Sequence, residues 1–375
     1  MIFMIKRYLF VLSVGGIIFF SGCGATPAKE AATIKIGFIG PITGPAAKYG
    51  ADNAALLAVQ EINGTGGING KKLEIIMEDG RCEPKTALSA INKLIYADQV
   101  KIILGGHCSP ETVTIAPIAE QNKVLLLASL SSNPEITHMG DYIFRTTAAS
   151  TARVPQTTNA LKEKFGIKKL ALVVEETSFA KPIGDIIQKG FEEAGGAVVA
   201  YETILPDEKD FRSILSKVKE SNADALYIAT QAPDKAIEII SEMRELGMPQ
   251  KIFGNESVGS VSLIEALKEG ANGIVFDAPF YDKSQINVQE FIKKYKEHFG
   301  SEPPYGSLTA ESYDAVYLVA EALKSVGEDP ERVRDYLYGV SEYKGASGTF
   351  GFDKSGDVTR KYGLYTIQDG RIEAY

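Results

Sequence analysis

Two segments of the chain place hydroxyl side chains directly before a helix-start pattern. Residues 104–111 contain Ser109 before Pro-Glu, and residues 127–135 contain Ser131 and Ser132 before Asn-Pro-Glu. Ser or Asn at an N-cap, Pro in the first turn and Glu shortly after it are signals that a helix begins. Because the free N–H groups and dipole of a helix N-terminus favour an anion, the three serines are candidate ligands of a carboxylate, although each also fits an ordinary helix cap.

Two further residues are candidates for other parts of a ligand. Residues 40–50 follow the first predicted strand and are rich in glycine, so the backbone can approach a ligand there, and Tyr49 would supply an aromatic wall. Glu256 follows a predicted strand over 251–254 and could pair with a ligand ammonium, which would offset the desolvation of the charges. The alternative for Glu256 is an ordinary exposed position in a loop.

The sequence gives little support for catalysis or metal binding. His107, His138 and His298 have no partners at metal-ligand spacing. Ser257 lies in a segment that faintly resembles a nucleophile elbow, but Asn255 stands where the first glycine of that motif belongs. We therefore expect no cofactor, no metal and no catalytic residue, and keep hydrolysis of an amide or ester as the enzymatic alternative.

The elements that must position these residues follow a repeating pattern. From Thr33 onward, short β-branched runs alternate with amphipathic helical stretches, as in 34–39, 51–63 and 73–77, and the alternation restarts after an irregular stretch over 146–153. Such alternation is typical of βαβ units. We therefore predict an α/β fold of two lobes, each with a doubly wound parallel sheet, and place the candidate residues at carboxyl ends of strands, where such sheets bind ligands.

Length and composition fit this organisation. The chain has 375 residues, of which 45% are hydrophobic and 23% charged, and its formal net charge is −8. About 350 residues would remain after removal of a leader, more than a single core usually serves, which favours two lobes. A negative net charge without a Lys/Arg block argues against nucleic acid as a partner.

The start of the chain has the pattern of a secreted lipoprotein. Lys6 and Arg7 precede an apolar run over 8–20, and small residues then lead to Cys23. The run is too short for a membrane span of about 20 residues but suits the apolar part of a signal peptide. We predict a signal peptide over 1–22, lipidation of Cys23 and a flexible tether over 23–32. An N-terminal helix with a chance cysteine is the alternative.

The remaining cysteines form an even pair. Cys82 and Cys108 lie in a chain that the predicted leader sends to an oxidising compartment. We therefore predict a disulfide between them, with two free buried thiols as the alternative. A disulfide that closes a loop of that length would stabilise the fold by roughly 3–4 kcal/mol on the chain-entropy estimate.

Several motifs together resemble leucine/isoleucine/valine-binding proteins of ABC importers. They are the leader with its cysteine, the opening at 40–50, Gly-Gly-Ile-Asn-Gly at 66–70, the segments around Cys82 and Cys108, and Glu-Ser-Tyr-Asp-Ala-Val at 311–316. The resemblance implies a type I periplasmic-binding fold whose lobes, joined by three crossings, close over a ligand. The N-terminal lobe would comprise 33–148 and 280–347, and the C-terminal lobe 149–279 and 348–375.

The resemblance also assigns roles to residues. It implies that Ser109 and Ser132, with backbone N–H groups, hold the carboxylate of an amino acid, while the Leu130 carbonyl and Glu256 hold its ammonium. Tyr49 corresponds to an aromatic residue of the pocket. These assignments concern the head group that all α-amino acids share.

The chain departs from the family where the ligand side chain would lie. Phe179 and Gln231 stand where the leucine-binding members have tyrosines, and Leu130 replaces a smaller residue. A polar amino acid, an amide and an aromatic acid therefore remain open beside a branched-chain amino acid.

The function implied by the resemblance is capture of an amino acid and its delivery to an inner-membrane ABC permease. We expect a monomer in the periplasm or at the cell surface, held to the membrane by the lipid at Cys23. A ligand sensor of the same fold is the alternative binding protein.

Overall fold

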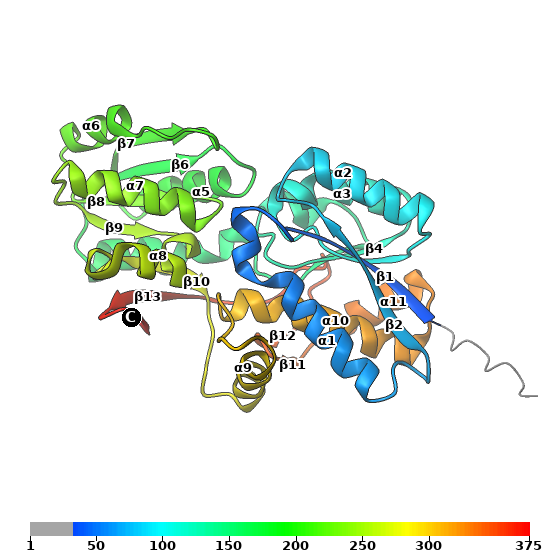
Figure 1. Cartoon of the computed structure of the whole chain (residues 1–375). Helices are drawn as coiled ribbons and strands as arrows, with labels where there is room; N and C mark the ends of the chain where they lie inside the picture. Colours follow the sequence, from blue (N-terminus) through cyan, green and yellow to red (C-terminus); the bar gives the residue numbers. More distant parts are fainter. Residues whose placement is uncertain (1–32) are drawn as a thin grey trace, which may run out of the picture.

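The computed structural model describes residues 33–375, which form two α/β lobes (Figure 1). The predicted signal peptide, the tether and the lipidation site at Cys23 lie outside the described residues. Within the described part of the chain, no helix is long and apolar enough to cross a membrane.

The first lobe is built on a five-stranded parallel sheet with the strand order β2-β1-β3-β4-β5. Its strands are β1 (Thr33–Gly40), β2 (Lys72–Asp79), β3 (Ile102–Leu104), β4 (Leu125–Ala128) and β5 (Ile143–Arg145). The run Val124–Ala128 is apolar throughout and fully buried, because helices cover both faces of a parallel sheet. This arrangement confirms the α/β fold predicted from the alternating pattern.

Helices cover the first sheet in two layers that come from distant parts of the chain. They are α1 (Ala51–Gly64), α2 (Pro84–Asn92), α3 (Ser109–Gln121), α9 (Ile286–Phe299), α10 (Ser307–Val326) and α11 (Pro330–Tyr338). One core cluster packs α1 and α10 on one face, with Leu57 and Val319 among its members, and another packs α2 and α3 on the other. The orange helices in Figure 1 thus complete a lobe that begins with the blue strands.

The second lobe contains a seven-stranded sheet with the order β14-β13-β10-β9-β8-β6-β7. Its strands are β6 (Lys169–Glu175), β7 (Ala197–Ile204), β8 (Ala225–Ala229), β9 (Lys251–Gly254), β10 (Val275–Pro279), β13 (Tyr362–Gln368) and β14 (Arg371–Ala374). Strands β6 to β10 are parallel, whereas β13 and β14 pair antiparallel at one edge. The last strands of the chain therefore belong to the second lobe.

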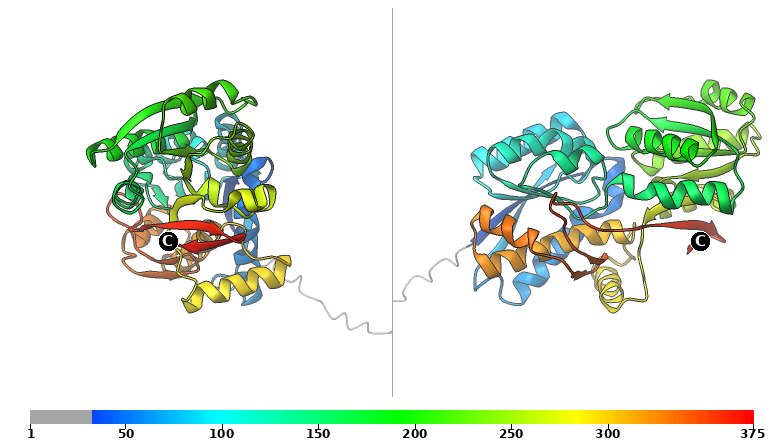
Figure 2. Two further views of the ribbon diagram at one scale, coloured as in Figure 1. Left: turned by 90° about the vertical axis from the view of Figure 1, so that its left-hand side faces the viewer. Right: turned by 180° about the vertical axis from the view of Figure 1, so that it is seen from behind.

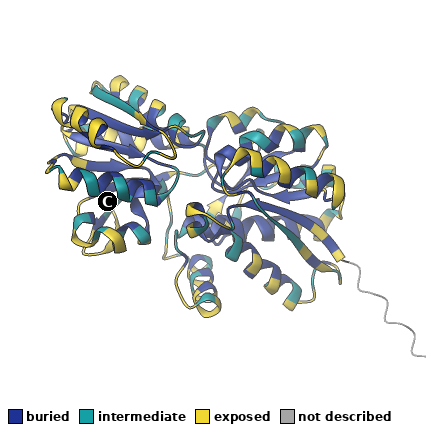
Figure 3. Cartoon of the chain, turned by 45° about the horizontal axis from the view of Figure 1, so that its top comes forward, coloured by how far each residue is buried: buried dark blue, intermediate teal, exposed yellow. Residues whose placement is uncertain are grey.

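The helices of the second lobe enclose its sheet in the same way. They are α4 (Val154–Asn159), α5 (Ala180–Glu193), α6 (Arg212–Glu220), α7 (Pro233–Glu245) and α8 (Val261–Leu267). Short 3-10 or π segments lie at Pro45–Tyr49, Lys93–Ala97, Pro134–His138, Ser150–Arg153, Ala160–Lys164, Glu256–Gly259 and Lys268–Ala271. Each lobe has its own buried interior with exposed residues on its outer helices (Figure 3).

Three crossings join the lobes, over 146–153, 280–285 and 359–361 (Figure 2). The third crossing lies later than the predicted boundary at 348. The hairpin of β11 (Tyr343–Gly345) and β12 (Gly348–Phe350) leads into Phe352, whose ring packs edge-on against Phe144. Because these aromatic side chains are buried in the first core, the chain stays in the first lobe until Val358.

Candidate functional site

Loops at the carboxyl ends of both sheets face each other and are joined by hydrogen bonds. The hydroxyl of Tyr49 donates to the carbonyl oxygen of Gln231 at 3.1 Å. The amide of Asn133 donates to the carbonyl oxygen of Ser178 at 2.6 Å. These contacts bring predicted residues of the two lobes to one interface, which we call the interlobe seam.

The first lobe contributes hydroxyl groups at the start of α3. Ser109 is the first residue of this helix and is fully buried, and its Oγ accepts the backbone N–H of Asn133 at 3.3 Å. Ser132 is 1% exposed, and its Oγ has no hydrogen-bond partner among the described residues. An unpaired buried hydroxyl beside a helix N-terminus is suited to an anionic group, which both the hydroxyl and the helix dipole would stabilise.

The third predicted serine is used differently. The Oγ of Ser131 lies 2.6 Å from Oγ1 of Thr112 and donates to the carbonyl oxygen of Gly106 at 2.9 Å. The single O–H donor of this hydroxyl thus has partners within the first lobe. The hydroxyl of its neighbour Ser132 has no such partner among the described residues.

Leu130 lies in the same loop and has an unusual backbone conformation. Its φ of 67° falls in the left-handed region, which residues with a Cβ seldom adopt. Its side chain packs with Tyr49 and Cys108 in a small apolar cluster. Backbone strain of this kind persists where the surrounding structure imposes it, often at binding sites, and here it shapes the turn that carries Ser132.

The second lobe contributes a buried group of charges. Glu256 is 6% exposed and follows β9, and Nη1 of the fully buried Arg153 donates to its Oε2 at 3.1 Å. The same Nη1 also donates to Asp277. Burial raises the pKa of Asp277, and Arg153 acts against this rise. Two carboxylates thus share one guanidinium, which leaves a net negative charge that a ligand cation can neutralise.

Aromatic side chains lie between these two groups. The rings of Tyr49 and Tyr305 are 4.3 Å apart at an angle of 51°. Burial raises the pKa of Tyr49 well above its usual value, and the nearby Tyr305, Glu256 and Glu175 add to the rise. The aromatic pair of the first lobe therefore lies close to the carboxylates of the second.

Two of the three residues that we expect to depart from the leucine-binding pattern, Phe179 and Gln231, lie at the second-lobe side of the seam. Phe179 precedes α5 and packs in that lobe's core. Gln231 follows β8, and its backbone N–H donates to Oε2 of Glu175 at 2.6 Å. The side-chain Oε1 of Gln231 is buried and has no hydrogen bond within residues 33–375.

Sequence reasoning missed several residues of this site. Asp277 stands inside the apolar strand β10, and a carboxylate between buried neighbours signals a buried partner. Arg153 lies in the irregular stretch between the lobes. A cation in that stretch was a possible partner for the carboxylate of Asp277. Tyr305 follows a Pro-Pro pair just before α10, which is the kind of loop that presents an aromatic residue.

The predicted disulfide between Cys82 and Cys108 is confirmed. The two oxygens of Glu111 accept the backbone N–H groups of Cys82 at 2.9 Å and Cys108 at 3.0 Å. Burial raises the pKa of Glu111 to about 7. These three residues form the single group in the described chain with metal-ligand proximity, but both sulfur atoms are joined in the disulfide.

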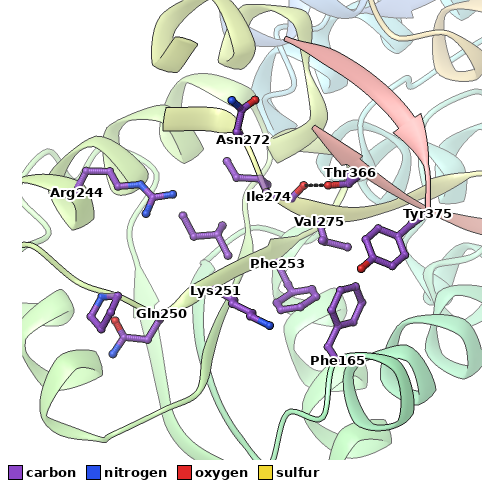
Figure 4. Close-up of a pocket in the computed structure, with 13 residues that line it drawn as sticks. Phe165, Arg244, Gln250, Lys251, Phe253, Asn272, Ile274, Val275, Thr366 and Tyr375 are labelled. Carbon is purple, nitrogen blue, oxygen red and sulfur yellow. Dashed lines mark hydrogen bonds between the residues drawn. The ribbon is translucent and has the colours of Figure 1, made fainter. Parts of the chain in front are cut away.

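Two hollows of the surface lie away from the seam. A pocket of about 410 Å³ on the second lobe is lined by Phe165, Gln250, Lys251 and Tyr375, among others (Figure 4). It opens where β9 and β10 begin, whereas the seam lies where the strands end. A second pocket of about 520 Å³ lies near α11. The predicted site residues line neither pocket.

Curated relatives cover nearly the whole chain. The leucine-, isoleucine-, valine-, threonine-, and alanine-binding protein of Pseudomonas aeruginosa is 29% identical over 338 residues, which cover 89% of each chain. The Leu/Ile/Val-binding protein of Escherichia coli is 28% identical, over 92% of this chain and 95% of the relative. Both are binding proteins.

Solved structures agree with the fold. The branched-chain amino acid substrate-binding protein of Streptococcus pneumoniae, in complex with isoleucine, matches with a TM-score of 0.84 at 27% identity, over 91% of this chain and 98% of that one. A solute-binding protein of R. palustris in complex with benzoate matches with a TM-score of 0.83 at 20% identity, over 92% and 95%. The profile of the periplasmic binding protein family matches residues 33–371. The chain therefore belongs to the periplasmic binding protein family.

Proposed function

We propose that this protein captures an α-amino acid between its lobes and delivers it to the permease of an ABC importer. The observation that carries this proposal is the opposite polarity of the two sides of the seam. One side offers the start of α3 with the hydroxyl of Ser132, and the other offers Glu256 and Asp277 sharing the charge of Arg153. A zwitterion matches both sides at once.

Each charge of the ligand has a stated partner in this proposal. Ser109, Ser132 and the N–H groups at the start of α3 bind the carboxylate, and Glu256 with the Leu130 carbonyl binds the ammonium. Tyr49, Phe179 and Gln231 border the side chain. Since charge-assisted hydrogen bonds in a water-excluded site are stronger than neutral ones, the head group would supply most of the orientation.

The names of the relatives support an amino acid as ligand. Those of P. aeruginosa and E. coli are named for leucine, isoleucine and valine, and the first also for threonine and alanine. The benzoate complex shares the fold, yet an aromatic carboxylate would leave the excess negative charge around Glu256 without a partner. We therefore favour an amino acid over an aromatic acid.

Delivery requires that the ligand favour the closed arrangement of the lobes. The seam already contains interlobe contacts, including an ion pair of 2.5 Å between Lys48 and Asp234, both of which are partly exposed. An exposed pair of this kind contributes little, about 0–1 kcal/mol. A ligand that contacts both lobes would add the differential affinity that shifts the equilibrium toward closure.

The predicted anchor completes the proposal. Lipidation at Cys23 would hold the protein at the membrane surface in the periplasm, close to a permease. We infer no catalytic step, because the relatives are binding proteins and the buried seam serines have structural or ligand-facing roles. A sensor would bind the same ligand, and transport by a reconstituted permease separates the two functions.

A ligand screen by thermal shift tests the proposal. Protein beginning at Thr26 is unfolded, refolded to remove bound ligand, and heated with each of the twenty amino acids and with benzoate. A ligand at about 100 times its Kd stabilises by about 2.7 kcal/mol. We expect shifts with a subset of amino acids that E256Q abolishes and that E265Q, at an exposed position of α8, retains. Shifts with benzoate alone would overturn the proposal.

A further inference from the structure

Three buried polar atoms at the seam have no hydrogen-bond partner among the described residues. They are Oγ of Ser178, Oε1 of Gln231 and the hydroxyl oxygen of Tyr305. Tyr305 lies near Ser260, whose Oγ accepts the backbone N–H of Leu263 at 3.0 Å. Native proteins pair nearly all buried polar atoms, so a cluster of unpaired ones at a binding surface indicates groups that await a ligand.

These three atoms belong to one neighbourhood. The ring of Tyr305 packs on Tyr49, and the hydroxyl of Tyr49 donates to the carbonyl oxygen of Gln231. The carbonyl oxygen of Ser178 accepts the amide of Asn133, which follows directly after the carboxylate-binding candidate Ser132. All three residues therefore lie at the seam, where the proposed function places the side chain of a bound amino acid.

We propose that the ligand is an α-amino acid whose side chain is uncharged and forms hydrogen bonds, such as a carboxamide or a hydroxyl. This inference rests on the proposed function. An apolar side chain would leave all three atoms unpaired, and a site built with polar groups rejects an analogue that lacks the matching group. A carboxamide provides both donors and an acceptor, and therefore suits a set that includes an amide oxygen and two hydroxyls.

Charged side chains fit this neighbourhood less well. The unpaired atoms are neutral, and the neighbouring acidic group Glu175 is buried and already accepts the N–H of Gln231. A side-chain carboxylate would be repelled by Glu175 and Glu256. A side-chain cation would be repelled by Lys235, whose positive charge already acts to lower the pKa of Glu175. An uncharged polar side chain avoids both costs.

Binding of isosteric ligand pairs, measured by calorimetry on ligand-free protein, tests the inference. The pairs are asparagine with leucine, glutamine with methionine, and threonine with valine. We expect the polar member of at least one pair to bind more than tenfold tighter, which corresponds to about 1.4 kcal/mol. Q231L should remove that preference. Q250L replaces another buried, unpaired amide far from the seam and should keep it.

The outcomes separate this inference from the proposed function. Tighter binding of the apolar member in every pair would overturn the inference and leave amino-acid capture intact. The same holds for a preference for charged amino acids. Failure of all twenty amino acids to bind would overturn the proposed function and the inference with it.

Discussion

The guanidinium of Arg153 donates to Oε2 of Glu256 at 3.1 Å and so connects the site to the hinge. Arg153 ends the first crossing between the lobes. It also bonds to Asp277, just before the second crossing, and its Nη2 donates to the hydroxyl of Tyr362 at 3.2 Å, just after the third. One buried cation at the end of the first crossing therefore contacts residues beside the other two crossings and a candidate ligand-binding carboxylate.

Replacing Arg153 with methionine should destabilise the protein strongly. Glu256 and Asp277 would be left buried without a counter-ion, and breaking a buried pair in this way costs about 3–5 kcal/mol. Urea denaturation of the ligand-free protein measures the loss of unfolding free energy.

The double variant R153M/D277N provides the control for this prediction. Because it removes one of the two stranded carboxylates, it should recover part of the lost stability. If R153M alone lowered the unfolding free energy by less than about 1 kcal/mol, the group would lack the buried electrostatic role assigned to it.

Neighbouring serines should respond differently to the same substitution. Ser132→Ala removes a hydroxyl that has no partner in the described chain, so it should weaken ligand binding about tenfold while stability is retained. Ser131→Ala breaks the contacts with Thr112 and Gly106, so it should lower stability by about 1 kcal/mol or more. Calorimetry and urea denaturation of both variants measure the two effects, and a reversed pattern would contradict the assignment.

The disulfide should contribute mainly to stability. Cys82 and Cys108 are 26 residues apart, and the chain-entropy estimate for such a loop is about 3–4 kcal/mol. C82S/C108S should therefore unfold at lower urea, and reductant should lower the midpoint of the native protein without changing that of the variant. Equal midpoints for oxidised and reduced native protein would show that the bond adds no stability.

The fold could be predicted because its signals are local. Alternation of β-branched runs and helices identifies parallel sheets, and the helix-start patterns that begin at Ser109 and Asn133 place hydroxyls at strand ends. The third crossing could not be located in this way. Phe350 and Phe352 fit a strand of either lobe, and their position depends on packing against Phe144 of a distant segment.

The site could be predicted only in part for a related reason. Spacing cannot tell the hydroxyl of Ser131, which is satisfied inside the lobe, from that of Ser132, which is free. The pairing of Arg153 with Asp277 spans most of a lobe in sequence, so no local pattern reveals it. Long-range partners of buried polar groups thus limit what the sequence alone can assign.

Stability should fall as pH rises through the titration of Glu311. This carboxyl is fully buried in α10 beside Leu130 and Thr147, and burial raises its pKa to about 8, although Arg360 at 4.0 Å opposes the rise. Since the folded state retains the proton that the unfolded chain loses near its ordinary pKa of 4.5, the stabilisation is complete below 4.5 and is lost as pH approaches 8.

The variant E311Q tests this linkage because its amide stays neutral at every pH. Burial also raises the pKa of Asp314, to about 6, and that of Glu111, to about 7, so the native protein loses stability over the same range for more than one reason. His107, whose pKa burial lowers from 6.5 to about 4, acts in the opposite direction: the native protein gains stability as pH rises from about 4 to 6.5, and E311Q shares this gain. Urea denaturation at about pH 6 and about pH 8.5 should therefore show a smaller loss in E311Q, by on the order of 1–3 kcal/mol. The variant E265Q changes an exposed carboxyl and should lose as much stability between the two pH values as the native protein does. Identical losses of stability in E311Q and native protein would mean that Glu311 does not titrate in this range.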